Sequence, residues 1–437
     1  MMEPSRFNIV SAIRDTGEFF IVNPLYGSAD MLSREEHDML VKGSPLPAEF
    51  SGRGYQVDPD EEQARFREAY LRFIDERDTD EVQLFFVPTY SCNFDCSYCY
   101  QLGYESRGGE LTREVIDAFF RYTDTEFGGR SRYVTLFGGE PLLPGKKHFG
   151  MIEYLIEFAT ARNTDIAVVT NGYHIDSYID VLKKARIREV QVTLDGTRPV
   201  HDSRRRHKNG EGTFDRIASA TDLLLENNIP VNLRMVVDRD NIGNLPDLAW
   251  FAIERGWTDS NHFSTQLGRN YELHDCQAKG ERLYSRIDLY AEIYRIIKEH
   301  PHVLDFHRPA FAVSRALYET GELPAPLFDA CPGTKTEWAF DYTGRIYACT
   351  ATAGKAGEEL GSFFPERVID LEKIEEWADR DILSVDECRE CNLALICGGG
   401  CAAVARNNGR GLNGPDCRPV KELMELGMAA YFGRSVT

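Results

Sequence analysis

The 437-residue sequence has no uninterrupted apolar run of about 18 residues, the length that a transmembrane helix requires. Its first residues, Met-Met-Glu-Pro-Ser-Arg-Phe-Asn, lack the apolar core of a signal peptide. Basic residues are also few, because 50 Lys and Arg stand against 70 Asp and Glu, a net charge of −20. Nucleic-acid binding needs a basic face. We therefore expect a cytoplasmic protein with neither a membrane nor a nucleic acid as partner.

Eleven cysteines in a chain without an export signal point to metal binding rather than to disulfides. Cys92, Cys96 and Cys99 follow an apolar, β-prone segment, 82–87, that ends at Pro88, so we expect them on a loop at the carboxyl end of a strand. No fourth Cys or His lies nearby to complete a tetrahedral zinc site. Three thiolates suit an iron–sulfur cubane with one open iron. A zinc knuckle and a chance grouping are the alternatives.

The chain divides into four expected units. Residues 1–80 predict a small α+β unit, with a hairpin over 7–22 and a capping box at Ser33-Arg-Glu-Glu36. Strand and helix patterns alternate over 81–270, which predicts parallel strands with an active site at their carboxyl ends. Residues 271–330 are expected to be a helical bridge, and 331–437 are rich in cysteine. The six expected barrel strands are 82–87, 133–137, 166–170, 189–194, 231–237 and 261–266.

Short motifs follow three of these strands. Gly138-Gly139-Glu140-Pro141 combines two glycines, which let a backbone approach a ligand closely, with a carboxylate that can meet an ammonium group. Thr170-Asn171-Gly172 ends the third strand, and Thr193-Leu194-Asp195-Gly196 ends the fourth. An ordinary turn would explain each motif taken alone. The residues that follow are His201, Asp202, Ser203, Arg204, Arg205 and Arg206.

Seven further cysteines lie within ninety residues of the C-terminal part. Glycines at 398–400 and the turn Asn413-Gly414-Pro415 suit a backbone that wraps around a cluster. Cys388 and Cys391 alone would suit half a zinc ribbon, so a two-zinc domain is the alternative. The seven cysteines are Cys331, Cys349, Cys388, Cys391, Cys397, Cys401 and Cys417.

The cysteine loop, the strand-end motifs and the C-terminal cysteines together resemble the radical S-adenosylmethionine (radical SAM) enzymes that carry a C-terminal SPASM domain. The resemblance covers roughly 82–420. It implies an α/β fold: a partial (β/α)6 TIM-like barrel, with a small α+β unit before it and the SPASM domain after it. It also implies that SAM chelates the open iron and is cleaved reductively to a 5′-deoxyadenosyl radical, which abstracts a hydrogen atom from the substrate.

The same resemblance assigns the SAM pocket. Thr193, where the family more often has Ser, would face the ribose, and Tyr98 would lie by the adenine unless it only packs in its loop. Arg205 would reach the SAM carboxylate, although its spacing leaves Arg204 and Arg206 as alternatives. Cys92, Cys96 and Cys99 would hold the SAM-binding [4Fe–4S] cluster. The remaining pocket residues would be Gly138, Gly139 and Glu140 near the methionine amino group, and Asn171.

Two auxiliary [4Fe–4S] clusters are implied as well. Cys331, Cys349 and Cys401 would hold one of them, which is one ligand short. Cys276 either completes that cluster, or is a buried thiol while the fourth iron stays open for substrate. The other cluster would be held by Cys388, Cys391, Cys397 and Cys417.

Auxiliary clusters can take up an electron from a substrate radical, so oxidation of the substrate is natural. We expect an oxidoreductase that matures ribosomally made peptides (RiPPs), cross-linking or otherwise oxidising a precursor peptide or protein, with a flavodoxin- or ferredoxin-type reductant. An anaerobic sulfatase-maturing enzyme, which forms formylglycine, is the first alternative. A non-catalytic iron–sulfur electron-transfer protein is the second, and the SAM-pocket motifs argue against it. The N-terminal unit is similar to leader-peptide-binding modules, with a structural cap on the barrel as the alternative.

Overall fold

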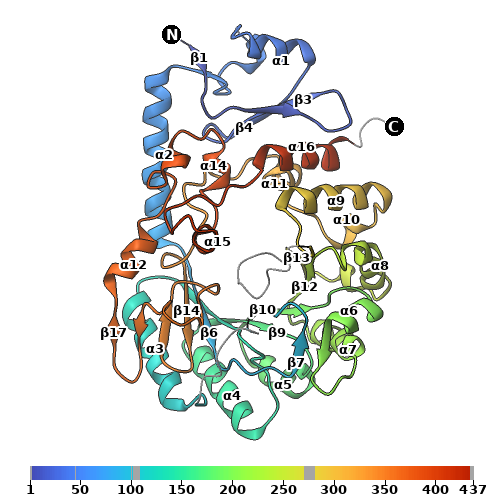
Figure 1. The fold of residues 1–437 in the computed structure, drawn as a ribbon, viewed down its shortest axis with the longest axis vertical. Helices are drawn as coiled ribbons and strands as arrows, with labels where there is room; N and C mark the ends of the chain where they lie inside the picture. The colour runs from blue at the N-terminus through green and yellow to red at the C-terminus, as the bar shows by residue number, and fades with distance from the viewer. Residues whose placement is uncertain (1, 45, 100, 102–108, 270–280, 434–437) are drawn as a thin grey trace.

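The computed structural model describes residues 2–44, 46–99, 101, 109–269 and 281–433. Figure 1 shows the N-terminal unit at one end of the molecule and the barrel helices at the other. The cysteine-rich segment, residues 331–433, runs between them beside the long helix α2 (Pro59–Thr79). No helix in these ranges is long and apolar enough to cross a membrane.

Six parallel strands form the barrel wall, in the order β13-β12-β10-β9-β8-β6. Two of them, β6 and β12, have their expected bounds and the others differ by at most three residues at either end, and the predicted α/β partial barrel is confirmed. In β8, β9 and β10 three or more buried residues follow one another, as is typical of parallel strands with both faces covered. Buried and partly buried residues alternate in β12, and no residue of β13 is fully buried. The strands are β6 (Val82–Val87), β8 (Arg132–Leu136), β9 (Asp165–Thr170), β10 (Ile187–Thr193), β12 (Val231–Val237) and β13 (Phe263–Arg269).

Helices between these strands cover the outer face of the wall (Figure 1). In α3, Val115, Ile116, Phe119 and Phe120 recur three or four residues apart and are all buried, so one stripe of the helix faces the sheet. The helices of this layer are α3 (Arg113–Phe127), α4 (Lys146–Thr160), α5 (Ile175–Leu182), α6 (Arg198–Arg204), α7 (Phe214–Glu226) and α8 (Leu245–Glu254).

The barrel sheet continues into the cysteine-rich segment. Strand β14 (Glu337–Asp341) pairs in parallel with β6, and β15 (Arg345–Tyr347) pairs antiparallel with β14. The first barrel strand is therefore flanked on one side by a strand that comes about 250 residues later in the chain. The rest of the segment contains β16 (Gly361–Ser362), β17 (Val368–Ile369), α12 (Leu371–Ala378), α13 (Asp386–Arg389), α14 (Ala394–Cys397), α15 (Ala402–Asn407) and α16 (Val420–Tyr431).

The N-terminal unit is a three-stranded antiparallel sheet, because β4 (Ser28–Leu32) joins the expected hairpin of β2 (Ile9–Ala12) and β3 (Phe19–Asn23). The predicted capping box is present, and α1 (Arg34–Val41) begins after Ser33. A further pair of short strands joins β1 (Glu3–Pro4) to β5 (Gln56–Val57). The bridge between barrel and cysteines is helical as expected, with α9 (Arg286–Glu299), α10 (Val303–Phe306) and α11 (Ser314–Thr320).

The N-terminal unit packs on the C-terminal part of the chain. The ring of Phe66 on α2 lies 5.3 Å from that of Phe328, and the Tyr70 hydroxyl donates to Asp381 over 2.7 Å. At the edge of the small sheet, the Arg14 amide donates to the Glu425 carbonyl of α16 over 3.4 Å. These contacts fix the unit against the cysteine-rich segment.

Candidate active site

The cysteine loop leaves the carboxyl end of β6 and is held by the segment after α6. Strand β7 (Phe94–Cys96) pairs antiparallel with β11 (Arg205–His207), which sets Arg205 opposite Cys96. The Ser97 amide also donates to the Arg204 carbonyl over 3.0 Å. Two motifs that lie more than a hundred residues apart in the sequence are thus joined by backbone hydrogen bonds.

Cys92, Cys96 and Cys99 are neighbours in this loop. Burial raises the pKa of the Cys92 thiol to about 12, with further increases from Glu140 and the other two thiols. Burial likewise raises the pKa of Cys96 to about 11. A bound metal reverses this effect, because it binds the thiolate and displaces the proton. The site is therefore chemically suited to a thiolate-bound metal centre rather than to free nucleophilic thiols.

Two groups direct N–H bonds at the Cys92 sulfur. The Phe94 amide lies 3.4 Å from it, and the Asn171 side-chain amide lies 3.9 Å from it. The same Asn171 nitrogen donates to Asn93 over 2.8 Å. The structure thus places the predicted site residue Asn171 at the cysteine loop. In iron–sulfur proteins, N–H bonds to the sulfur ligands help to set the reduction potential of the cluster.

Gly138 and Gly139 pack against the backbone of the cysteine loop. A Cβ atom on Gly139 would lie 2.1 Å from the Ser91 carbonyl oxygen, and one on Gly138 would lie 2.7 Å from Val87 Cγ1. The Gly139 amide donates to the Thr89 carbonyl over 3.1 Å. Gly138 also has a φ of 127°, which side-chain-bearing residues rarely adopt. The two glycines therefore allow the segment after β8 to pack closely on the cysteine loop.

Glu140 is fully buried, and its carboxylate is bound by groups of this chain. It accepts hydrogen bonds from the Thr170 hydroxyl at 2.6 Å, the Asn171 amide at 2.7 Å and the Leu142 amide at 2.8 Å. It therefore ties the loop after β8 to the turn after β9. These contacts support a role for Glu140 in positioning Asn171.

Arg205 is buried beside Tyr98. Its Nη1 donates to the Tyr98 hydroxyl over 2.6 Å, whereas its buried Nε has no hydrogen-bond partner among the described residues. A buried guanidinium nitrogen without an acceptor fits an anionic ligand, such as the carboxylate expected there. Thr193, the last residue of β10, is buried at the same carboxyl edge of the sheet.

Arg204 and two aspartates form a buried ion-pair network that the sequence motifs did not reveal. Arg204 Nη1 lies 2.8 Å from Asp238, and its Nε lies 3.2 Å from Asp195. Its guanidinium also lies 5.0 Å from the centroid of the Tyr98 ring. Because Arg204 is committed to these partners and Arg206 is exposed, Arg205 is the best placed of the three arginines for an anion.

The His-Asp motif before these arginines is structural. His201 is fully buried, accepts from the Asp195 amide and contacts the Thr213 hydroxyl at 3.0 Å. Burial lowers the pKa of His201 to about 3, so the ring is neutral at physiological pH. Asp202 accepts from the amides of Thr213 and Phe214 and so fixes the start of α7. Together they position the arginine-bearing strand β11.

The seven C-terminal cysteines fall into two groups. Burial raises the pKa of Cys388 to about 11, and its neighbouring thiols are Cys397, Cys391 and Cys417. Burial also raises the pKa of Cys349, whose neighbouring thiols are Cys331 and Cys401. The resemblance implied the same division into four thiols and three, and their role as cluster ligands stays a prediction. None of the ten cysteines within the described ranges forms a disulfide, and Cys276 lies outside those ranges.

Arg380 holds the loops that carry these cysteines. Its side chain is fully buried, and it donates to the carbonyls of Leu412 at 2.7 Å and Gly399 at 2.7 Å. It also donates to the carbonyls of Gly414 at 3.1 Å and Gly400 at 3.2 Å. One guanidinium thus satisfies four backbone acceptors from two loops that hold Cys397, Cys401 and Cys417 in place.

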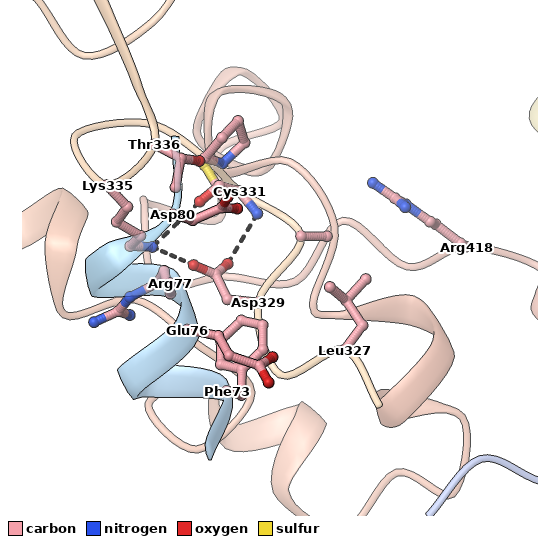
Figure 2. Close-up of a pocket in the computed structure, with 12 residues that line it drawn as sticks. Phe73, Glu76, Arg77, Asp80, Leu327, Asp329, Cys331, Lys335, Thr336 and Arg418 are labelled. Carbon is pink, nitrogen blue, oxygen red and sulfur yellow. Dashed lines mark hydrogen bonds and ion pairs between the residues drawn. The ribbon is translucent and has the colours of Figure 1, made fainter. Parts of the chain in front are cut away.

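A cavity of about 430 Å³ lies beside Cys331, between the end of α2 and the loop before β14. Figure 2 shows Asp329 between two partners: the Cys331 amide, which donates to it over 2.9 Å, and Lys335. Lys335 also donates to the Arg380 carbonyl over 2.8 Å. This buried pair connects the Cys331 loop to Arg380.

Comparison with known proteins agrees with this geometry. Residues 86–251 match the family model of the radical SAM superfamily. The chain is 29% identical over 170 residues to the probable GTP 3′,8-cyclase of Methanocaldococcus jannaschii, covering 38% of this chain and 54% of that one. It thus spans about half the length of such curated relatives. It is 23% identical over 329 residues to the cysteine-type anaerobic sulfatase-maturating enzyme of Clostridium perfringens, covering 71% of this chain and 85% of that one.

Two solved structures share the fold at low sequence identity. One is anSMEcpe with bound AdoMet, with a TM-score of 0.60 and 20% identity, covering 80% of this chain and 97% of that one. The other is SuiB of Streptococcus suis bound to S-adenosylmethionine, with a TM-score of 0.57 and 16% identity, covering 96% and 99%. Membership of the superfamily implies a [4Fe–4S] cluster and SAM. Residues 86–251 therefore match a radical SAM domain, and the chain has the fold that anSMEcpe and SuiB share.

Proposed function

We propose that this protein is a maturase that oxidatively cross-links residues of a ribosomally made precursor peptide. The observation that carries the proposal is the N-terminal three-stranded unit, which is fixed on the cysteine-rich segment. The SuiB fold matches 96% of this chain, whereas the anSMEcpe fold matches about 80%. SuiB has also been solved with its precursor peptide SuiA, which supports a peptide substrate for a chain of this length and arrangement.

The proposed cofactors are SAM and three [4Fe–4S] clusters, reduced by a flavodoxin- or ferredoxin-type protein. When bound and reduced, the first cluster and SAM supply the radical that removes hydrogen from the substrate. Among this chain's own residues, Cys92, Cys96 and Cys99 would hold that cluster, and Arg205 would orient SAM through its carboxylate.

The proposed peptide-docking edge is β4. In the order β2-β3-β4 both outer strands are edges, but β2 lies against α16. An edge strand can capture an extended peptide by main-chain pairing. Met31 on β4 exposes 47% of its surface and would lie beside such a peptide.

A sulfatase-maturating activity is the second candidate, because the Clostridium perfringens enzyme aligns with 71% of this chain. The two activities differ in the product. Cross-linking removes two hydrogens from the peptide, whereas conversion of Cys to formylglycine removes sulfur and adds oxygen. Mass spectrometry separates these outcomes.

The deciding experiment uses anaerobically reconstituted full-length protein with SAM and dithionite. One arm receives a Cys-, Tyr- or Trp-containing peptide encoded beside the gene, and the other receives the Cp18Cys peptide that is bound in a solved anSMEcpe structure. We expect SAM cleavage in both arms and loss of two hydrogens in the first arm alone. Formylglycine in Cp18Cys would instead establish the sulfatase-maturating activity. SAM left uncleaved in every arm would leave only the electron-transfer alternative.

A matched pair of variants tests the docking edge. Met31→Asp should abolish modification of the precursor peptide while SAM cleavage without peptide stays at the wild-type rate. Leu71→Asp should change neither, since Leu71 exposes 62% of its surface and lies on α2 rather than on the three-stranded sheet. Full-rate modification by the Met31→Asp protein would rule out docking at this strand.

A further inference from the structure

Arg234 projects from the inner face of the barrel wall. Residues of β12 are alternately buried and partly buried, and the buried ones belong to the hydrophobic core beneath the helices. Because successive side chains of a strand point to opposite faces, the partly buried Arg234 lies on the face that the helices do not cover. The parallel register sets it beside Thr193 of β10 and Gln266 of β13. Neighbouring strands lie about 4.8 Å apart, so Arg234 adjoins the residue expected to face the SAM ribose.

Two amide side chains and a glycine hold the Arg234 guanidinium in place. Its Nη1 donates to the Gln191 side-chain oxygen over 3.3 Å, and the Gln191 nitrogen donates to Gln266 over 2.8 Å. A Cβ atom on Gly268 would lie 2.8 Å from Arg234 Nε and 2.9 Å from Nη2, so a larger residue there would displace the guanidinium. Gly268 lies two residues beyond Gln266, towards the carboxyl end of β13. The guanidinium is thus held near the edge of the sheet that carries the SAM-pocket motifs.

The charge of Arg234 is not neutralised within the described part of the chain. Its buried Nε has no hydrogen-bond partner there, and the side chain forms no ion pair with a described residue. The two glutamines beside it are neutral. Glu189, the carboxylate on the same face of β10, accepts from the Asn232 side chain over 3.2 Å instead. Buried guanidinium nitrogens are normally hydrogen-bonded, so Arg234 has capacity for an acceptor that these residues do not supply.

The carboxylates at the carboxyl edge of the same strands are bound by other arginines. Asp195 lies 3.2 Å from Arg204, and Asp238 lies 2.8 Å from it. Asp238 also lies 3.4 Å from Arg282. Charges that are withdrawn from water are usually paired, and Arg204 follows this rule whereas Arg234 does not among the described residues. The complement of Arg234 is therefore an anion that comes from outside the chain.

We propose that Arg234 binds a carboxylate of the substrate peptide, either an Asp or Glu side chain or the C-terminus. The planar guanidinium suits this ligand, because it can donate two parallel N–H bonds to one carboxylate. A peptide held in this way has the residues next to its carboxylate beside Thr193, and so beside SAM. The inference rests on the proposed function, since it requires a peptide substrate. It makes Arg234 a specificity-determining residue, which selects peptides with a carboxylate at the matching position.

The test measures peptide binding to the full-length, cluster-loaded protein by fluorescence anisotropy, anaerobically and with SAM present. The probe is the fluorescein-labelled Cys-, Tyr- or Trp-containing peptide encoded beside the gene. Arg234→Gln should weaken its binding roughly 10- to 150-fold, as expected for the loss of a charge-assisted hydrogen bond. Isothermal titration should show unchanged SAM affinity. Arg188→Gln is the matched control and should bind the peptide normally, because Arg188 lies near the amino end of β10 and donates to Glu81 over 2.6 Å.

A second set of measurements leaves the protein unaltered. Each Asp and Glu of the peptide is changed in turn to Asn or Gln, and the C-terminus is amidated in a further variant. One of these changes should weaken binding to the wild-type protein by the same factor as Arg234→Gln. The two changes together should weaken it no more than either alone, because they remove the same contact.

Three results would overturn the inference and leave the proposed function standing. The first is full-strength peptide binding by the Arg234→Gln protein. The second is a set of additive losses for every peptide variant, which would place Arg234 and the carboxylate at separate contacts. The third is weaker SAM binding with unaltered peptide binding, which would assign Arg234 to the cofactor. A wild-type protein that neither binds nor modifies the peptide would overturn the inference together with the proposed function.

Discussion

Arg205 donates a 2.6 Å hydrogen bond to the Tyr98 hydroxyl, and the buried Nε of the same guanidinium has no acceptor within the described part of the chain. The cysteine loop and the arginine strand therefore meet at a side chain whose hydrogen-bonding capacity is only partly used. Arg204, one residue earlier, is bound by Asp195 and Asp238. Neighbouring arginines in one motif thus differ: Arg204 is fully paired with protein groups, whereas Arg205 keeps a nitrogen available for the proposed ligand.

Arg205→Ala should weaken SAM binding roughly 10- to 150-fold, because a hydrogen bond to a charged group contributes about 1.5–3 kcal/mol. Isothermal titration with SAM measures the effect, and the iron content should not change. Arg206→Ala, on the exposed side of the same strand, is the matched control and should bind normally. Arg204→Ala should instead lower stability by about 3–5 kcal/mol, since it leaves two buried aspartates unpaired. Unaltered SAM affinity in the Arg205 protein would discard its proposed role.

Changing Cys92, Cys96 and Cys99 together to Ala should remove about a third of the iron and all SAM cleavage. The other seven described cysteines form separate groups, so their clusters should remain. Iron and sulfide analysis of the anaerobically reconstituted protein should give about twelve of each per chain before the change. Stoichiometric zinc with little iron would contradict the cluster assignment.

Arg380→Met should destabilise the cysteine-rich segment by more than about 3 kcal/mol, because four buried carbonyls lose their donor. We expect iron to be lost from the auxiliary sites while the SAM-binding site keeps its own. Arg345→Met is the control, as Arg345 is exposed on β15. Full iron content in the Arg380 protein would show that the loops hold without it.

His201 should make the protein less stable in acid. The pKa of His201 is about 3 in the folded state and about 6.5 in the unfolded state. Between these two pH values the unfolded chain therefore binds a proton that the folded chain does not bind. The contribution of neutral His201 to the free energy of unfolding is fully present above about pH 6.5. It is lost as pH falls towards 3, by up to about 1.4 kcal/mol per pH unit. Anaerobic urea unfolding between pH 5 and 7 should show a shallower pH dependence in His201→Asn. Equal slopes in both proteins would contradict this account.

Most of the barrel strands could be predicted because they are local, largely apolar segments bounded by turn residues. Strand β13, Phe-Ser-Thr-Gln-Leu-Gly-Arg, is less apolar, and its observed bounds differ from the expected ones by two to three residues. Strand β4 was missed, since Ser28–Leu32 is short and carries Asp30 at its centre. The pairing of β14 with β6 was also beyond prediction. Strand order depends on contacts between distant segments, and the sequence of residues 337–341 does not indicate which strand it pairs with.

The candidate site was predictable to the extent that its residues lie in short motifs. The resemblance grouped the cysteines and suggested Arg205, but it could not separate Arg205 from Arg204, because only burial and the partners Asp195 and Asp238 distinguish them. The two glycines were expected near the methionine amino group, and their close packing on the cysteine loop was not foreseen.

The place of β6 between β8 and β14 has a consequence for biosynthesis. When Val82–Val87 leaves the ribosome, one of its two partner strands lies about 250 residues further along the message. At about 5–20 residues per second, that edge waits roughly ten to fifty seconds for its second neighbour. A strand of the sequence Val-Gln-Leu-Phe-Phe-Val with one open edge is prone to pair with another chain. The open edge of β6 in the nascent barrel therefore has to be kept from other chains, for example by a chaperone, until β14 has been made.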